Sequence, residues 1–137
     1  MNTLTFSSLS LSFGQADHPR LSGELVLPHK KKYDLLLDTG FSLGIAFPKT
    51  LLPQFRFTDG FLSTMVLADE RTVSAFTFLV DLSVVEQENS QLVRNLGQVS
   101  CVFMNGAVET VAGIELMKLL SPLTLDWDKS LITSKLG

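Results

Sequence analysis

The chain has 137 residues, of which 45% are hydrophobic and 18% are charged. This length fits one folded domain, residues 1–137, and the composition is typical of a globular protein. The formal net charge of −3 argues against a nucleic-acid binder, because such proteins bind phosphates through a basic surface. The enrichment in Phe, Leu, Val, Ser and Thr favours strands. We therefore expect a single, mostly β domain without a nucleic-acid partner.

Cys101 is the only cysteine in the sequence. The chain therefore cannot form an internal disulfide, and a reducing compartment is the simplest expectation. The N-terminus lacks the positive charge and the sustained apolar core of a signal peptide. No apolar run approaches the roughly 18 residues needed to cross a bilayer. We expect a cytoplasmic protein without a membrane partner.

The first part of the chain contains three predicted strands. Residues 4–13 alternate between polar and apolar types with a change of phase after Phe6, which predicts a strand with a bulge. Residues 21–27 and 32–38 lie on either side of a turn and should form a hairpin. The second of these contains three consecutive leucines, which is typical of a strand buried on both faces. This strand would carry Asp38 to the mouth of the core.

Asp38 is followed by residues that can hold its carboxylate. Thr39 and Ser42 offer hydroxyl groups, and Gly40 allows a backbone N–H to approach closely. The alternative is that Asp-Thr-Gly only turns the chain, because Asp and Gly are common turn residues.

A second hairpin is expected in the middle of the chain. Before this hairpin, residues 48–53 begin and end with proline, which predicts a single helical turn closed by the second proline. Residues 62–68 and 73–85 are strand-like and flank a polar tetrad, which predicts a hairpin with a charged tip. The four residues of this tip are Asp69, Glu70, Arg71 and Thr72.

The last part of the chain should contain strands and one short helix. The pattern predicts strands over residues 98–104 and 108–112, separated by the turn signal Asn105-Gly106. Residues 114–120 can form two helical turns before Pro122 stops them. Residues 123–127 alternate and are expected to form the last strand.

Other catalytic or metal chemistries receive little support from the sequence. The run from Gly40 to Gly44 matches the nucleophile-elbow pattern Gly-x-Ser-x-Gly, which requires a helix after the turn. Pro48 disfavours that helix, and both histidines precede Ser42, although a hydrolase of this kind needs its base downstream. Two histidines and one cysteine without paired spacing disfavour a zinc site. No nucleotide-binding glycine loop is present.

The segment 38–42, with the leucines before it, resembles the active-site loop of the aspartic proteases. In a chain this short, the resemblance is to the retropepsin-like, single-domain kind. It continues with a hairpin before the loop, a flap hairpin over residues 62–80, and a closing strand over residues 123–127. A second landmark of the family is two apolar residues and a glycine before a short helix, which Val111-Ala112-Gly113 matches. The alternative for Gly113 is an ordinary helix start.

The resemblance implies an all-β, closed acid-protease (retropepsin-like) barrel with one short α-helix near the C-terminus. It implies an aspartic-type peptidase, a hydrolase acting on a peptide or protein substrate as a homodimer. Each chain would contribute one catalytic Asp38, because this hydrolysis needs one carboxylate as base and another as acid. Neither a metal nor an organic cofactor is implied.

The resemblance also assigns roles to the residues around Asp38. Thr39 would bond across the dimer, Gly40 would donate its N–H to the carboxylate, and Ser42 would bond the outer carboxylate oxygen. Gly113 would let the second loop pack closely, and Asp69, Glu70, Arg71 and Thr72 would form the flap tip.

Two features depart from the family. Phe41 stands where many viral members have a small residue, and the flap tip lacks their glycines. The alternative function is a non-catalytic peptide-binding or assembly module, which keeps the barrel and uses its cleft or flap edge.

Overall fold

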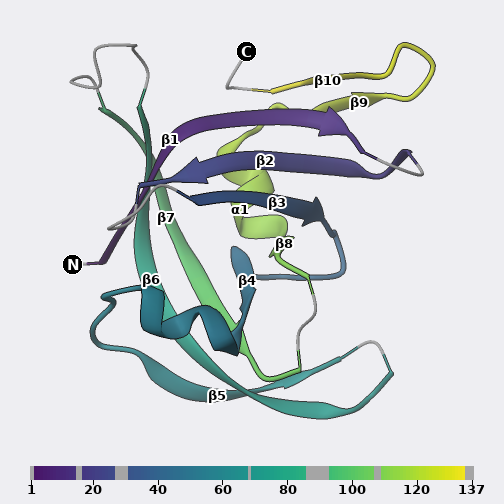
Figure 1. Cartoon of the computed structure of the whole chain (residues 1–137). Helices are drawn as coiled ribbons and strands as arrows, with labels where there is room; N and C mark the ends of the chain where they lie inside the picture. Colours follow the sequence, from purple (N-terminus) through teal and green to yellow (C-terminus); the bar gives the residue numbers. More distant parts are fainter. Residues whose placement is uncertain are drawn as a thin grey trace.

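The computed structural model describes residues 2–14, 17–26, 31–67, 69–85, 93–106 and 109–134. These residues form a closed β-barrel with few helices (Figure 1), which confirms the all-β expectation. The elements in chain order are β1 (Asn2–Phe13), β2 (Pro19–Leu25), β3 (Lys31–Leu37), β4 (Ile45–Pro48), the 3-10 helix η2 (Lys49–Gln54), β5 (Phe61–Val66), β6 (Thr72–Val85), β7 (Val93–Met104), β8 (Val111–Ala112), α1 (Ile114–Leu119), β9 (Thr124–Asp126) and β10 (Leu131–Thr133).

The barrel closes between its first strand and a strand from the middle of the chain. The order around it is β1, β2, β3, β8, β4, β7 and β6, and β1 pairs in parallel with β6. β5 pairs with the first part of β6 and forms a hairpin that extends from the barrel (Figure 1). The helix α1 packs against β7. None of the described helices is long and apolar enough to cross a membrane.

The first strands follow the local sequence pattern. The register of β1 against β2 shifts between Phe6 and Ser8, which is the predicted bulge. β2 and β3 form the predicted antiparallel hairpin, with Leu21 opposite Leu35. β3 also pairs with β8, so the strand before Asp38 is held on both edges.

The leucines of β3 are less uniformly buried than the sequence suggested. Leu35 is fully buried in the core, whereas Leu36 and Leu37 are half-buried. Leu36 shares the outer face of β3 with the exposed Asp34, which leaves Leu36 only partly covered, and Leu37 is the last residue of the strand.

Aromatic side chains fill the core below β4 and β7. Phe47 stacks on Phe103 with ring centroids 5.3 Å apart, and Phe55 lies 5.1 Å from Phe103 edge-on. Such offset and edge-on pairs add to the stabilisation from apolar burial. This cluster supports the strands on either side of the Asp38 loop.

The C-terminal part differs from the prediction for residues 123–127. β9 is not the last strand, because it pairs with β10 in a separate two-stranded sheet. This sheet lies along β1 (Figure 1). Trp127 anchors it by packing on Phe13, with ring centroids 5.2 Å apart, and by donating its indole N–H to the carbonyl of Asp17. Leu131–Thr133 is too short to show a strand period.

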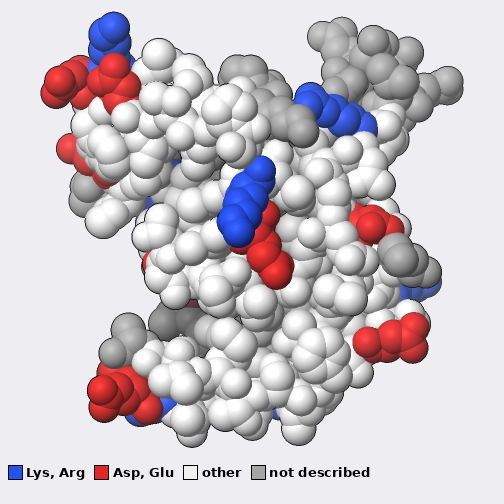
Figure 2. Space-filling model, turned by 180° about the vertical axis from the view of Figure 1, so that it is seen from behind, with Lys and Arg blue, Asp and Glu red and all other residues white. Residues whose placement is uncertain are grey.

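Two other segments differ in detail. The turn of helix expected near Pro48 is η2, a 3-10 helix that contains Pro53. The strand expected over residues 108–112 is limited to β8, and Val108 lies outside the described residues. The face of the molecule in Figure 2 carries acidic and basic side chains scattered among neutral ones.

Candidate active site

Asp38 comes directly after β3, where two loops of the chain meet. Its backbone N–H donates to the carbonyl of Ala112 at 2.9 Å, which extends the β3–β8 pairing. Its carboxylate is exposed, and the Oδ1 atom accepts the N–H of Gly40 at 2.8 Å. The Asp-Thr-Gly segment therefore both turns the chain and orients the carboxylate, because a backbone donor two residues on holds it in place.

The start of α1 is bonded to the loop that follows Asp38. The Gly113 N–H donates to the Gly44 carbonyl at 2.7 Å, and the Ile114 N–H donates to the Phe41 carbonyl at 2.9 Å. The first N–H groups of a helix have no partner within the helix. Here the Asp38 loop supplies carbonyl acceptors for them, so the two loops lock each other.

Gly113 is required by this close approach. A Cβ atom at this position would overlap the Leu43 carbonyl oxygen and would lie 2.6 Å from that of Phe41. Both neighbours are backbone atoms whose positions are fixed by hydrogen bonds. A residue with a Cβ atom would therefore not allow the two loops to approach this closely, whereas glycine does.

A cleft of about 330 Å³ lies against Asp38. Its walls come from the Asp38 loop, from the end of β7 and from the β5–β6 hairpin. Of the described residues that line this cleft, only Asp38 is titratable. The apolar lining includes Phe41, Met65, Val66, Leu67 and Met104.

The β5–β6 hairpin ends in a tight turn formed by the predicted tip. The Glu70 N–H donates to the Leu67 carbonyl at 2.9 Å, and Glu70 itself has a φ of 68°. Asp69 accepts the Arg71 backbone N–H at 3.1 Å and its Nε–H at 2.5 Å. Both hydrogen bonds lower the pKa of Asp69, and the bond from the Arg71 backbone has the larger effect. The tip is thus closed by an aspartate and a left-handed Glu70, at a position where hairpins usually have glycine.

In the described part of the chain, no hydrogen bond joins the predicted site residues other than Gly40 to the Asp38 carboxylate. Thr39 and Ser42 are exposed. In the described part of the single chain, neither makes a hydrogen bond to Asp38. Thr72 begins β6 and is exposed. The bond predicted from Ser42 to the outer carboxylate oxygen is therefore not found here, and the role of Thr39, which involves a second copy of the chain, stays a prediction.

The described residues contain neither a group of metal ligands nor an accessible thiol. Within those ranges, no three His, Cys, Asp or Glu side chains form a group that could hold a metal ion. Cys101 is fully buried on β7, and burial raises the pKa of its thiol, with Glu115 adding to the effect. A protonated, inaccessible thiol is not a nucleophile.

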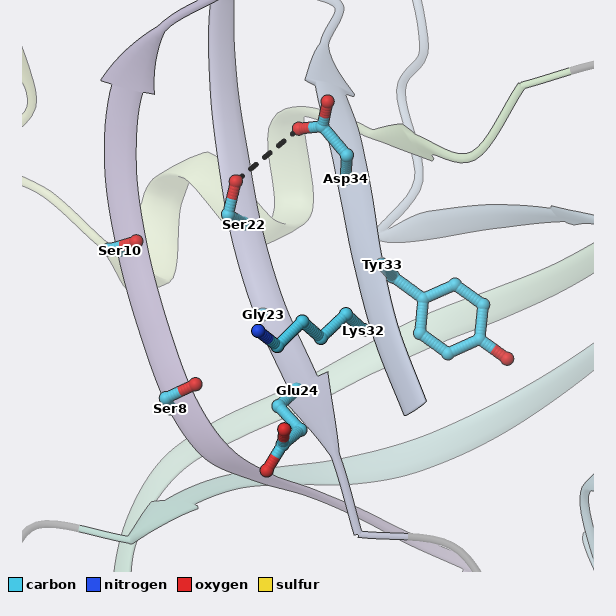
Figure 3. A pocket seen from close by; sticks show the side chains of 8 residues that line it. All are labelled: Ser8, Ser10, Ser22, Gly23, Glu24, Lys32, Tyr33 and Asp34. Atoms are coloured by element: carbon cyan, nitrogen blue, oxygen red, sulfur yellow. Dashed lines mark hydrogen bonds between the residues drawn. The ribbon is translucent and has the colours of Figure 1, made fainter. Parts of the chain in front are cut away.

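A larger hollow, of about 460 Å³, lies on the outer face of β1, β2 and β3 (Figure 3). Its two carboxylates already have partners: Glu24 accepts from Ser7 at 2.7 Å, and Asp34 lies 3.4 Å from Arg20. The Tyr33 ring points away from the hollow (Figure 3). We favour the smaller cleft, because there the β5–β6 hairpin and the Asp38 loop line one cleft that contains a carboxylate.

Sequence reasoning missed Met65 and Met104 as walls of the cleft. No local signal marks them, because each is an ordinary apolar residue of its strand. Comparisons with protein-family models, with curated proteins and with solved structures found no match.

Proposed function

We propose that the chain is a retropepsin-like aspartic endopeptidase that works as a homodimer. One observation above all supports this: the Asp38 carboxylate, held by the Gly40 N–H, lies at a cleft that is also lined by the β5–β6 hairpin and by the end of β7. In this proposal the hairpin, whose residues Met65, Val66 and Leu67 line the cleft, would act as the flap over a bound peptide.

The chemistry requires two carboxylates. One takes a proton from water, while the other, protonated, donates to the substrate carbonyl. The described lining of the cleft supplies only Asp38, so the second carboxylate would be Asp38 of a second copy. Catalysis of this kind needs one of the two carboxylates ionised and the other protonated at the same time. The rate of hydrolysis would therefore be bell-shaped with pH and highest on the acid side.

The test is peptide cleavage by the Asp38→Asn variant. The amide is nearly isosteric but cannot act as a base, so turnover should be lost while the fold remains. Asp34→Asn is the matched control, because Asp34 is an exposed aspartate on the same strand and lies outside the cleft. Equal cleavage by the parent and by Asp38→Asn would refute the proposal.

A non-catalytic peptide-binding module is the second candidate. It is favoured by the exposure of apolar side chains on the edge strand β5, where Leu62 and Val66 are 64% and 70% exposed. An exposed edge can take up a further strand. Peptide binding that is unchanged in Asp38→Asn, together with no cleavage by the parent, would select this function.

A further inference from the structure

We infer that Phe41 limits the size of the substrate side chain that the cleft admits beside Asp38. This inference rests on the proposed function. Phe41 follows the Asp-Thr-Gly segment, is half-buried and lines the cleft. Its ring lies against the second loop, because a Cβ atom on Gly113 would come within 2.5 Å of the Phe41 Cδ2 atom. The ring therefore packs against Gly113 at the side of the cleft.

The backbone of Phe41 is fixed from both sides. Its N–H donates to the Asp38 carbonyl at 3.1 Å, and its carbonyl accepts the Ile114 N–H at 2.9 Å. A larger substrate group cannot displace the ring by shifting the backbone without breaking the bonds that join the two loops. The main chain of Phe41 is therefore held in place, and the packing of its ring against Gly113 restricts the side chain.

Two other lining residues are adaptable. Met65 comes from β5 and Met104 from the end of β7, and both are half-buried in the cleft. Unbranched methionine side chains adjust to the shape of a partner, whereas a packed phenylalanine ring does not. The size limit is therefore set by Phe41.

The volume of the cleft points to the class of substrate. About 330 Å³ is near the lower end of the roughly 300–1,000 Å³ typical of ligand pockets. A charged substrate side chain would find no partner in the described lining except Asp38, and burying it unpaired is costly. The expected substrates are peptides with an aliphatic residue of modest bulk at this position, and aromatic residues should be disfavoured.

The experiment measures peptide binding, so that it does not depend on turnover. Fluorescein-labelled octapeptides of alternating Ala and Ser, with one central Ala, Leu, Phe or Trp, are titrated against full-length Asp38→Asn protein by fluorescence anisotropy. The same titrations are repeated with two double variants, which carry Phe41→Leu or Phe41→Ala in addition to Asp38→Asn. The Leu peptide should bind best in the starting protein. Phe41→Ala should raise the affinity for the Phe and Trp peptides relative to Leu by about tenfold, and Phe41→Leu by less, because even one methylene in a hydrophobic pocket changes discrimination by roughly 10- to 200-fold.

The matched control is Phe61→Ala, since Phe61 is 53% exposed on β5 and lies outside the lining of the cleft. It should leave the order of affinities unchanged. If Phe41→Ala fails to fold by circular dichroism, the milder Phe41→Leu decides the result. An unchanged order in the folded Phe41 variants, or no binding of any peptide, overturns the inference.

Cleavage of the same peptides by the parent chain separates the two proposals. If a Phe41-dependent order of affinities is found but no peptide is cleaved, the proposed protease function fails and the role of Phe41 stands. If Asp38-dependent cleavage is found with an order that Phe41 does not affect, the protease function stands and this inference fails.

Discussion

At the residue scale, Gly113 is where the two loops of the site approach each other most closely. Gly113→Ala would place a Cβ atom against two backbone carbonyl oxygens, and we expect a loss of about 3 kcal/mol in the free energy of unfolding. Gly40→Ala is the control, because the nearest atom to its Cβ is the terminal Oδ1 of Asp38 at 3.1 Å, which can move. Urea denaturation measures both. Equal losses in the two variants would contradict this account of the site.

Tyr33 is a second residue with a measurable consequence. Its hydroxyl is buried without a hydrogen-bond partner among the described residues, and burial raises the pKa of the phenol. An unpaired buried hydroxyl is unfavourable, so we expect Tyr33→Phe to be neutral or to stabilise the fold by about 1 kcal/mol.

The pH dependence of the Tyr33→Phe effect has a definite sign. The unfolded chain releases the phenolic proton first, so the folded state holds more protons above about pH 10 and stability falls as the pH rises. Tyr33→Phe should remove the part of the loss in folding stability at alkaline pH that comes from the phenol. Unfolding measured at pH 7 and at alkaline pH checks it, and a clear destabilisation at pH 7 would show that the hydroxyl has a partner.

At the element scale, the β5–β6 hairpin is expected to behave as a lid that is less stable than the barrel. Its tip depends on the bonds from Arg71 to Asp69, whereas Leu35 lies in the core. Weakly packed segments open with lower free energies than core strands. The Arg71 amide should therefore exchange faster than that of Leu35, and Asp69→Asn should speed it further.

The pKa shift of Asp69 fixes the pH range for this measurement. Because the folded pKa is lowered, the contribution of Asp69 to the tip is present above the ordinary aspartate range and is lost as the pH falls through the lowered value. Exchange at neutral pH therefore reports the intact turn. Glu70→Gln is the control, since no hydrogen bond of the Glu70 carboxylate is found in the described residues. A tip as well protected as Leu35 would argue against a lid.

At the scale of the whole molecule, the site is expected to be completed by a symmetric dimer. Each described cleft supplies one Asp38, and an isologous interface would bring the same loop of both copies to the twofold axis. Light scattering over micromolar concentrations should show the dimer. Asp38→Asn should retain or strengthen it, because the substitution removes a repulsion between carboxylates. A chain that stays monomeric under all assay conditions would remove the mechanism proposed above.

The sequence by itself determined the features that depend on near neighbours. The bulge of β1, the β2–β3 hairpin and the strands on either side of the polar tip follow from alternation and turn residues, because those signals act over a few residues. The bond from Gly40 to Asp38 is equally local. Pro122 predicted where the helical segment stops, and α1 ends shortly before it, at Leu119.

Only the tertiary structure decided which distant segments meet. The pairing of β1 with β6, the contact of Gly113 with the loop after Asp38, and the placement of Met65 and Met104 in one cleft join residues far apart in the chain. Alternation tells which face of a strand is apolar, but it does not specify the partner of that face. The walls of the site were set by barrel closure, because the closure brings β5, β7 and β8 to the end of β3.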